Sequence, residues 1–229
     1  MRIAIIGYGQ MGKMVELAAK KKGYEVVCCI DPKCEIKSVH ADAISLADVC
    51  IDFSKPDCLL DNVRNAAECG KNIVVGTTGW HEHLDEVKAV VLKSKIGFLH
   101  SPNFSLGINL FLKIVAEAAR LMRFHDEYDV GGIECHHKLK VDAPSGTAKA
   151  IAHTLVQNLK RPDLKELTFT SLRCGTIPGT HQVIFDSPSD MITLTHEARD
   201  RKSFAEGALI AAEWLAGKTG FYTIDDLWK

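Results

Sequence analysis

The sequence of 229 residues has no surplus of charge of one sign, since 28 lysines and arginines stand against 29 aspartates and glutamates. These charges are scattered along the chain rather than grouped in blocks. A protein that binds nucleic acid or a membrane surface through its overall field needs a basic excess or a basic stripe. The composition therefore predicts neither nucleic acid nor a membrane as a partner, while a local basic site for an anionic ligand stays open.

Long apolar runs are also missing, because no segment approaches the roughly 18 apolar residues of a membrane span. The N-terminal segment MRIAIIGYGQMG is broken by glycines and does not resemble a secretion signal. None of the eight cysteines belongs to a CxxC pair, and several lie in apolar runs such as VVCCI. We therefore expect reduced, mostly buried cysteines, no metal site and a cytoplasmic protein.

The first hundred or so residues alternate short β-branched runs with amphipathic helical stretches. This alternation is typical of a parallel sheet with helices on both faces. The stretch between Asp31 and Asp48 has little pattern and predicts a loop or a short crossover. The expected strands are Arg2–Ile6, Glu25–Ile30, Val49–Phe53, Ile73–Val75 and Gly97–His100, and the expected helices are Gln10–Lys22, Pro56–Cys69 and His81–Lys93.

The pattern changes after Phe104, where a long apolar helix leads into a run of strands. Together these elements predict a second, α+β domain over residues 105–200, built on a mixed sheet of about four strands. A last helix has one apolar face, and we expect it to return to the first domain, which then comprises residues 1–104 and 201–229. The expected elements are helices at Leu106–Phe124, Thr147–Leu159 and Lys202–Lys218, and strands ending at Glu134–His137 and covering Leu167–Arg173, His181–Phe185 and Met191–Thr195.

A glycine-rich motif directly follows the first expected strand and opens a helix, which is the context of a dinucleotide-binding fingerprint. Glycines there allow a tight turn and a close approach of the backbone to a pyrophosphate, which the helix N-terminus also attracts. Asp31 ends the second expected strand, where an acid binds the hydroxyls of the adenosine ribose and repels a 2′-phosphate. The expected contacts of NADH or NADPH are Gly7, Gly9, Gln10, Met11, Gly12 and Asp31, with a preference toward NADH.

Two further segments follow expected strands of the same sheet, and ligands bind at the carboxyl ends of strands in open parallel sheets. Either segment alone could be a plain turn. Their small and hydroxyl-bearing side chains could line the nicotinamide end of the cofactor. The predicted contacts are Gly76, Thr77 and Thr78 after one strand, and Ser101, Pro102, Asn103 and Phe104 after the next.

The segment ECHHKLKVDAPSGTA, residues 134–148, places two histidines and two lysines just before a Pro-Ser-Gly-Thr turn that begins a helix. The first amides of that helix can bind an anion, and Lys140 and the histidine pair add positive charge or donors. This chemistry suits a small ligand that carries carboxylates. An exposed charged loop before a capped helix is the plainer alternative.

The four motifs GYGQMG, VVGTTGW, SPNFSLGIN and ECHHKLKVDAPSGTA, in this order and spacing, resemble those of the dihydrodipicolinate reductases. The segments RCGTIPGTHQVIF and LTHEARDRKSFAEGA are similar too, so the resemblance runs from Met1 to about Tyr222. The pattern HHxxKxDxPSGTA is its most specific part. The family often has Arg-His where this chain has Lys138 and Leu139, so no role is carried over to those two positions.

The resemblance implies a role for each matching residue of this loop. His136 matches the residue described as the acid or base, and Lys140 matches the proton donor. His137 matches a substrate contact, and Gly146 and Thr147 match the pair that binds a substrate carboxylate.

The resemblance also implies the fold and the reaction. The expected fold is α/β, with a Rossmann-type nucleotide-binding domain and a substrate domain that closes about hinges near Phe104 and Asp200. The expected reaction is reduction of 4-hydroxy-tetrahydrodipicolinate, a cyclic dicarboxylate, by NADH or NADPH, in a homotetramer assembled through the substrate-domain sheets. The alternatives are homoserine or aspartate dehydrogenase, which lack the HHxxKxDxPSGTA loop, and a nicotinamide-sensing regulator, which would need a DNA-binding segment.

Overall fold

The computed structural model describes residues 1–36, 38–161, 164, 166–167, 169–200 and 202–229. Two compact units make up the chain: Met1–Ser105 with Lys202–Lys229, and Leu106–Arg201. Position 168 of the expected strand Leu167–Arg173 and position 201 of the expected domain boundary lie outside the described residues.

The first unit contains, within its described residues, a sheet of six strands in the order β10-β5-β4-β3-β1-β2, and every neighbouring pair is parallel. The central strands are short and almost wholly apolar because helices cover both of their faces. The strands are β1 (Arg2–Ile6), β2 (Glu25–Ile30), β3 (Val49–Asp52), β4 (Asn72–Val75), β5 (Gly97–His100) and β10 (Gly220–Thr223).

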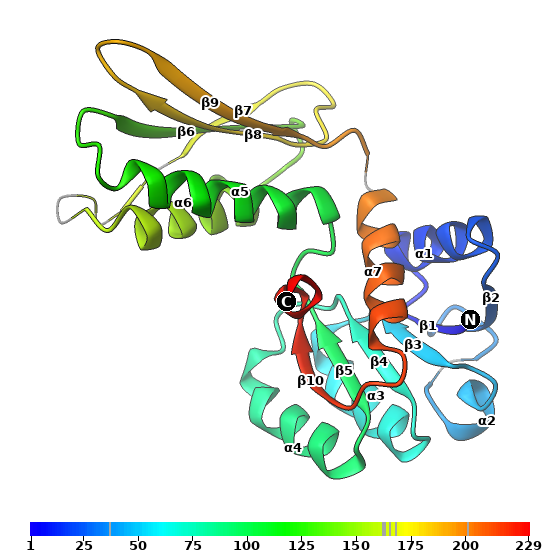
Figure 1. Cartoon of the computed structure of the whole chain (residues 1–229). Helices are drawn as coiled ribbons and strands as arrows, with labels where there is room; N and C mark the ends of the chain where they lie inside the picture. Colours follow the sequence, from blue (N-terminus) through cyan, green and yellow to red (C-terminus); the bar gives the residue numbers. More distant parts are fainter. Residues whose placement is uncertain (37, 162–163, 165, 168, 201) are drawn as a thin grey trace. The chain divides into compact units, whose positions relative to one another are not determined.

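Two helical layers enclose this sheet and form two separate cores. One core lies under α1 (Gln10–Lys21) and α7 (Lys202–Leu215), which pack side by side (Figure 1). The other core lies under α2 (Ala41–Ile44), α3 (Pro56–Glu68) and α4 (Leu84–Ser94). The 3-10 helices η1 (His81–His83) and η2 (Ile224–Trp228) complete the unit.

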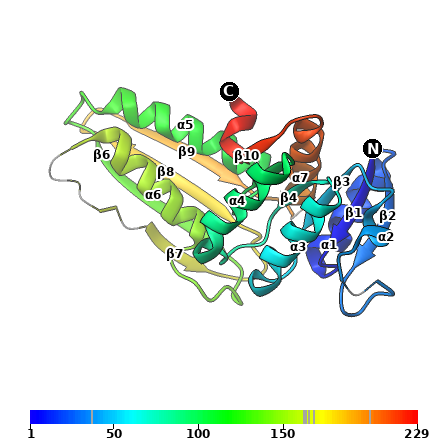
Figure 2. The same ribbon diagram turned by 90° about the horizontal axis from the view of Figure 1, so that it is seen from below.

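In its described residues, the second unit has a mixed sheet in the order β7-β6-β8-β9 and two helices that run along one of its faces (Figures 1 and 2). β6 is parallel to β7 and antiparallel to β8, and β8 is antiparallel to β9. The strands alternate buried and accessible residues because only one face of the sheet is covered. The elements are α5 (Leu106–Met122), β6 (Asp129–His136), α6 (Gly146–Leu159), β7 (Phe169–Arg173), β8 (Thr180–Asp186) and β9 (Met191–Glu197).

The predicted fold class is confirmed: a Rossmann-type α/β unit accompanies a unit with a mixed sheet of four strands. The prediction missed β10, which forms an edge of the parallel sheet beside β5. The last long helix ends at Leu215 rather than Lys218, because Gly217 has a positive φ of 71° that ends the helical path. Among the described residues, no helix is both long and apolar enough to cross a membrane.

The cysteines are less buried than predicted. All eight lie in the described part of the chain as free thiols, but only Cys28 and Cys50 are buried. Cys29 lies on the edge strand β2, and Cys58 lies on the exposed side of α3. Strand-like sequence runs gave no indication of which strands lie at the edge of the sheet.

Candidate functional site

The loop between β1 and α1 has the backbone of a dinucleotide-binding turn. Gly7 has a positive φ of 84°, and a Cβ there would overlap the carbonyl group of Phe53. A Cβ on Gly12 would overlap the carbonyl oxygen of Gly7, so the start of α1 packs directly on the turn. Gly9 is exposed, and a Cβ added to it would meet no described atom within 4 Å. The turn therefore needs two of its glycines for packing, while the third leaves the backbone open to a ligand.

The N-terminus of α1 can bind an anion. Gly9 caps this helix without a side-chain hydrogen bond, and the first turn contains no acidic residue. Gln10 is exposed, and Met11 is half-buried against the core under α1 and α7. The first backbone N–H groups of α1 thus face a site whose partial positive charge favours phosphate.

Asp31 follows β2 and is fixed in place by the neighbouring backbone. Its Oδ2 accepts a hydrogen bond from the N–H of Tyr8 at 3.0 Å, and its Oδ1 accepts one from the N–H of Lys33 at 3.0 Å. Because each carboxylate oxygen can accept a second hydrogen bond, Asp31 retains acceptors for ribose hydroxyls. The hydrogen bond from Tyr8 connects the end of the second strand to the glycine turn.

The strand order places a topological switch point between β1 and β3. The chain passes from β1 to β2 on one side and then from β2 to β3 on the other, and ligands bind beyond the carboxyl ends of strands at such a point. Phe53 directly follows β3 at this edge, and its ring takes the space that a side chain on Gly76 would need. The ring also meets Phe104 edge to face, with centroids 6.2 Å apart. The sequence prediction missed Phe53, although an aromatic residue at the end of a buried strand was a visible signal.

Thr77 is buried, and its hydroxyl hydrogen-bonds to the protein. Its Oγ1 donates to Oδ1 of Asp52 at 2.6 Å, and Asp52 is fully buried at the end of β3. Burial raises the pKa of Asp52, and hydrogen bonds from Thr77, Ser54 and Asn62 oppose that rise. Thr77 therefore connects the loop after β4 to β3, whereas its neighbour Thr78 is exposed. This leaves the backbone of Thr77 and the side chain of Thr78 as the groups that can contact a ligand.

The segment after β5 is an ordered turn. The Oγ of Ser101 donates to the carbonyl of Asn103 at 2.7 Å, and the N–H of Asn103 donates back to that Oγ at 3.1 Å. Phe104 is buried, and its carbonyl takes the space that a side chain on Gly207 of α7 would need. Pro102 is exposed at the tip of the turn. The predicted cofactor residues thus all lie at the carboxyl edge of one sheet, and the glycine turn fits a bound dinucleotide.

In the second unit, β6 ends at His136 and a loop leads to α6. His136 is buried, and burial lowers its pKa, while the carboxylate of Glu134 acts in the opposite direction. Lys140 is partly buried, and its Nζ donates to Oδ1 of Asp142 at 2.7 Å. The N–H of Lys140 donates to the carbonyl of His137 at 3.1 Å, which forms a turn. The two predicted acid–base residues and the predicted substrate contact therefore share one short loop.

The N-terminus of α6 forms the other side of this loop. Ser145 caps the helix, and its Oγ accepts a hydrogen bond from the N–H of Ala148 at 3.1 Å. Gly146 is exposed and Thr147 is half-buried in the first turn, which has no acidic residue. The backbone N–H of Gly146 and the ammonium group of Lys140 both help to lower the pKa of Asp142. The ammonium group of Lys140 and the amide of Gly146, both in the predicted substrate site, therefore stabilise the carboxylate of Asp142.

A buried polar cluster lies beneath this loop, and most of it escaped the sequence prediction. Glu134 is fully buried and accepts hydrogen bonds from the loop and from β7, and His181 of β8 lies close to it. Glu134, His136 and His181 offer ligand atoms within 4.8 Å of one another. Arg173 already neutralises the carboxylate at 2.7 Å, which disfavours a divalent cation there. The expected absence of a metal stays a prediction.

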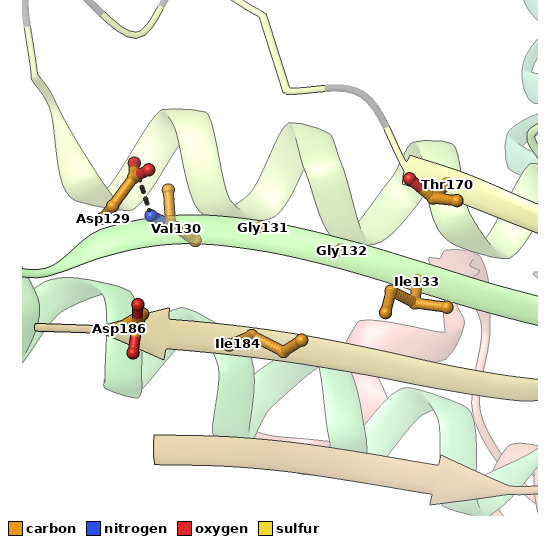
Figure 3. Close-up of a pocket in the computed structure, with 8 residues that line it drawn as sticks. All are labelled: Asp129, Val130, Gly131, Gly132, Ile133, Thr170, Ile184 and Asp186. Carbon is orange, nitrogen blue, oxygen red and sulfur yellow. Dashed lines mark hydrogen bonds between the residues drawn. The ribbon is translucent and has the colours of Figure 1, made fainter. Parts of the chain in front are cut away.

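One pocket of the second unit lies away from this loop, over the first half of β6, whereas His136 is the last residue of that strand (Figure 3). Its position does not match the predicted substrate site, and its lining includes two aspartates, which would repel a dicarboxylate. The lining residues are Asp129, Val130, Gly131, Gly132, Ile133, Thr170, Ile184 and Asp186.

Comparisons with known proteins agree with this arrangement. Residues 1–104 match the family model described as dihydrodipicolinate reductase, N-terminus, and residues 107–228 match the one described as dihydrodipicolinate reductase, C-terminus. A 4-hydroxy-tetrahydrodipicolinate reductase of Archaeoglobus fulgidus is 36% identical, with 99% of each chain covered. One of Christiangramia forsetii is 34% identical over 99% of this chain and 97% of the relative. A solved dihydrodipicolinate reductase from Paenisporosarcina sp. TG-14 with dipicolinate bound is 23% identical, has a TM-score of 0.83 and shares the fold over 99% of each chain. The chain therefore belongs to the dihydrodipicolinate reductase family.

Proposed function

We propose that this protein is a cytoplasmic enzyme that reduces 4-hydroxy-tetrahydrodipicolinate to tetrahydrodipicolinate with NADH or NADPH, in the synthesis of diaminopimelate and lysine. The observation that carries the proposal is the loop of residues 136–147, which gathers two histidines, Lys140 and a helix N-terminus in a member of this family. Free thiols at all eight cysteines suit a reducing compartment. Family membership favours this reaction over those of homoserine and aspartate dehydrogenase.

The two units would divide the work. Residues 1–104 and 201–229 would bind the dinucleotide through the glycine turn, Asp31 and the carboxyl edge of the sheet. Residues 105–200 would bind the substrate and join the subunits. When bound, the dihydronicotinamide supplies a hydride, which is chemistry that side chains do not provide.

The substrate loop would supply charge and a proton. Loss of the 4-hydroxyl group as water gives a conjugated imine. Addition of hydride to that imine leaves an electron-rich, enamine-like centre that must be protonated, and the ammonium group of Lys140 can donate that proton. His136 would act as the neighbouring acid or base at its Nε2. The amides of Gly146 and Thr147, with the side chain of His137, would bind a carboxylate of the substrate.

A coupled assay tests the proposed function directly. Aspartate semialdehyde, pyruvate and the preceding synthase generate the substrate in the cuvette, and the absorbance of NADH or NADPH reports turnover. We expect oxidation of the cofactor that requires all three components. A purified, folded protein that oxidises neither cofactor in this assay would refute the proposal.

The fixed carboxylate of Asp31 predicts which cofactor is preferred. Asp31 should accept hydrogen bonds from the ribose of NADH and repel the 2′-phosphate of NADPH. The side chain of Lys33 is exposed, and an exposed ion pair contributes only about 0–1 kcal/mol, so Lys33 should not reverse this effect. We expect kcat/KM with NADH to equal or exceed that with NADPH.

The variants Asp31→Ala and Lys33→Ala should shift this ratio in opposite directions, toward NADPH and toward NADH. Asp31→Asn is a second comparison, because it removes the charge at nearly the same size and keeps an acceptor for one of the two N–H groups, of Tyr8 or of Lys33. A parent enzyme that prefers NADPH by more than about tenfold, roughly 1.4 kcal/mol, would contradict this role of Asp31.

The substrate loop also predicts an inhibitor. Pyridine-2,6-dicarboxylate carries two carboxylates on a planar ring and should bind at Gly146 and Thr147 beside His137. We expect inhibition that is competitive with the substrate, and a crystal structure should show a carboxylate at the N-terminus of α6. Binding of this ligand away from residues 136–147 would overturn the assignment of the substrate site.

The uncovered face of the mixed sheet supports the proposed homotetramer. Ile133, Leu172, Ile184 and Met191 share the face opposite α5 and α6 by strand register, and Leu172 and Met191 are 50% and 61% exposed. These four side chains form an apolar patch on a face that also carries polar residues such as Gln182 and Thr193, and an exposed apolar patch is typical of a subunit interface.

We expect the parent to elute at about 100 kDa, the mass of four chains of 25.2 kDa. The double variant Leu172→Lys and Ile184→Lys should elute as a smaller species. Ile114→Lys, which alters an exposed apolar residue of α5, is the control and should leave the tetramer intact. A parent that elutes as a monomer would contradict this interface.

A further inference from the structure

Glu134 has an unusual position for a carboxylate. It lies on β6, two residues before His136, and its side chain is fully buried. A buried charge of this kind costs several kcal/mol unless it is paired and hydrogen-bonded, so its partners indicate its purpose. Those partners come from three different elements of the second unit.

One carboxylate oxygen of Glu134 is surrounded by donors. Its Oε1 accepts hydrogen bonds from the N–H of Ser145 at 3.1 Å, from the Oγ of Ser171 at 2.7 Å and from Nη2 of Arg173 at 2.7 Å. Ser145 is the cap of α6, whose first turn forms the proposed carboxylate site. The same Nη2 of Arg173 also donates to the carbonyl of Asp142 at 2.6 Å, next to the loop that carries Lys140. Oε1 therefore connects β6, β7 and the substrate loop.

The other oxygen faces two imidazole rings. Oε2 lies 3.1 Å from Nδ1 of His136 and 3.9 Å from Nε2 of His181, and among the described residues neither Oε2 nor Nδ1 has a hydrogen-bond partner of good geometry, so the carboxylate acts on the ring through its charge at short range. The two rings meet edge to face with centroids 5.2 Å apart, and Nε2 of His181 lies 3.2 Å from the Oγ of Ser145. The ring of His136 thus lies with Nδ1 on the side of the carboxylate. Its Nε2 is directed to the opposite side, against Gly179, where a side chain would press on it.

The charge of Glu134 determines whether Nδ1 of His136 is protonated. Burial raises the pKa of Glu134, but the hydrogen bonds from Ser145, Ser171 and Arg173 outweigh it and lower the pKa to about 2. The group is thus an anion at neutral pH and can only accept a proton or a hydrogen bond. A neutral imidazole facing it gains most when its proton sits on Nδ1, because the partner of one ring nitrogen sets the tautomer.

We propose that Glu134 is the positioning residue of the substrate site: it holds His136 in the tautomer with Nδ1 protonated, so that Nε2 is free to exchange a proton with the substrate, and it fixes the cap of α6. This inference rests on the proposed function and deepens it. Glu134 acts through His136 and Ser145 and touches no substrate atom itself. A plain structural ion pair with Arg173 would stabilise the unit without affecting the imidazole.

The tautomer can be measured in the parent protein without substrate or cofactor. Long-range ¹H–¹⁵N spectra distinguish a protonated Nδ1 from a protonated Nε2, and the spectrum of His136→Gln assigns the signals. We expect His136 with the proton on Nδ1 at neutral pH. A proton on Nε2, or a fast mixture of both forms, would overturn the proposal whether or not the enzyme is active on the proposed substrate.

Glu134→Gln tests the consequence for turnover. It keeps the size of the side chain, removes the charge and places an amide where Oε1 or Oε2 was. We expect kcat to fall between about 10-fold and about 100-fold, part of the roughly 10²–10⁴-fold that a positioned acid or base contributes. The KM for NADH should stay within about twofold, because Glu134 belongs to the substrate-binding unit. Ser171→Ala is the matched control, because it removes one donor to Oε1 while leaving the carboxylate charged. Its kcat should fall much less than that of Glu134→Gln.

The pH profile separates positioning from a structural role. Glu134 raises the pKa of His136, so Glu134→Gln should move the limb of the kcat profile that reports His136 to lower pH. The other charged or titratable groups near His136 are Lys140 and Asp142 of the loop, Arg173 of β7 and His181 of β8, and Glu134→Gln leaves all of them in place.

A folded Glu134→Gln enzyme with the kcat and pH profile of the parent would refute the proposal. If Glu134→Gln does not fold, the tautomer of His136 measured in the parent protein still tests the proposal. A parent without turnover in the coupled assay would refute the proposed function alone, because the tautomer is measured independently of it.

Discussion

Replacing Lys140 with alanine should lower kcat by about 100-fold or more, as expected when a positioned proton donor is lost. Lys140 is the partly buried cation of the substrate loop, held at 2.7 Å by Asp142. Alanine would remove both the proposed transferable proton and a positive charge beside the proposed carboxylate site. The affinity for NADH should hardly change, because the dinucleotide would bind to the other unit.

Lys138→Ala is the matched comparison for this substitution. Lys138 lies in the same loop, but its side chain is exposed. Lys138→Ala should therefore retain most of the parent's kcat. Steady-state kinetics in the coupled assay gives kcat, and a binding titration gives the affinity for NADH. A Lys140→Ala enzyme with nearly normal kcat would remove Lys140 as the proton donor, and equal losses in both variants would indicate a general effect of charge.

The second large effect is expected at the glycine turn. Gly7→Ala should abolish measurable binding of NADH and also destabilise the protein. Gly7 has a φ of 84°, which costs a residue with a Cβ about 1–3 kcal/mol. The new Cβ would in addition overlap the carbonyl group of Phe53, so the β1–α1 loop or the end of β3 would have to move.

Gly9→Ala separates binding from folding at the same turn. A Cβ on Gly9 would meet no described atom within 4 Å, so the fold should tolerate it. The methyl group would still stand where the backbone approaches the pyrophosphate, so the affinity for NADH should fall by about tenfold or more, roughly 1.4 kcal/mol.

Thermal unfolding distinguishes the two variants. Gly7→Ala should lower Tm by at least about 2 °C, since 1 kcal/mol corresponds to about 2–4 °C for a protein of this size. Gly9→Ala should leave Tm unchanged in the absence of cofactor. If Gly9→Ala binds NADH as the parent does, the pyrophosphate does not lie on this turn.

The regular elements were predictable because they carry local signals. The strands Arg2–Ile6, Glu25–Ile30 and Gly97–His100 have the predicted bounds, since each is a short apolar run between charged residues or glycines. β10 was missed because GFYT becomes a strand by pairing with β5, more than a hundred residues earlier. Pairing over that separation leaves no local pattern.

The candidate site was predictable in part for a similar reason. The residues of the glycine turn and of the 134–148 loop are neighbours in sequence, so their spacing was readable. The three residues that donate hydrogen bonds to Glu134 lie between 11 and 39 residues away and meet it through the strand register of β6 with β7 and the turn into α6. The hydroxyl of Thr77 was predicted to face the cofactor, yet it donates to Asp52, which is 25 residues away on the adjacent strand. Register and burial, rather than residue type, decide such contacts.

The late position of α7 and β10 in the chain determines the order in which the protein can fold during synthesis. Without Lys202–Lys229, the first 105 residues lack one edge strand and the helix that covers Val74 and Leu99. The unit at Leu106–Arg201 is one continuous segment and can complete its core as soon as it leaves the ribosome. The nucleotide-binding unit, although translated first, therefore finishes last, and until then α1 alone covers one apolar face of its sheet.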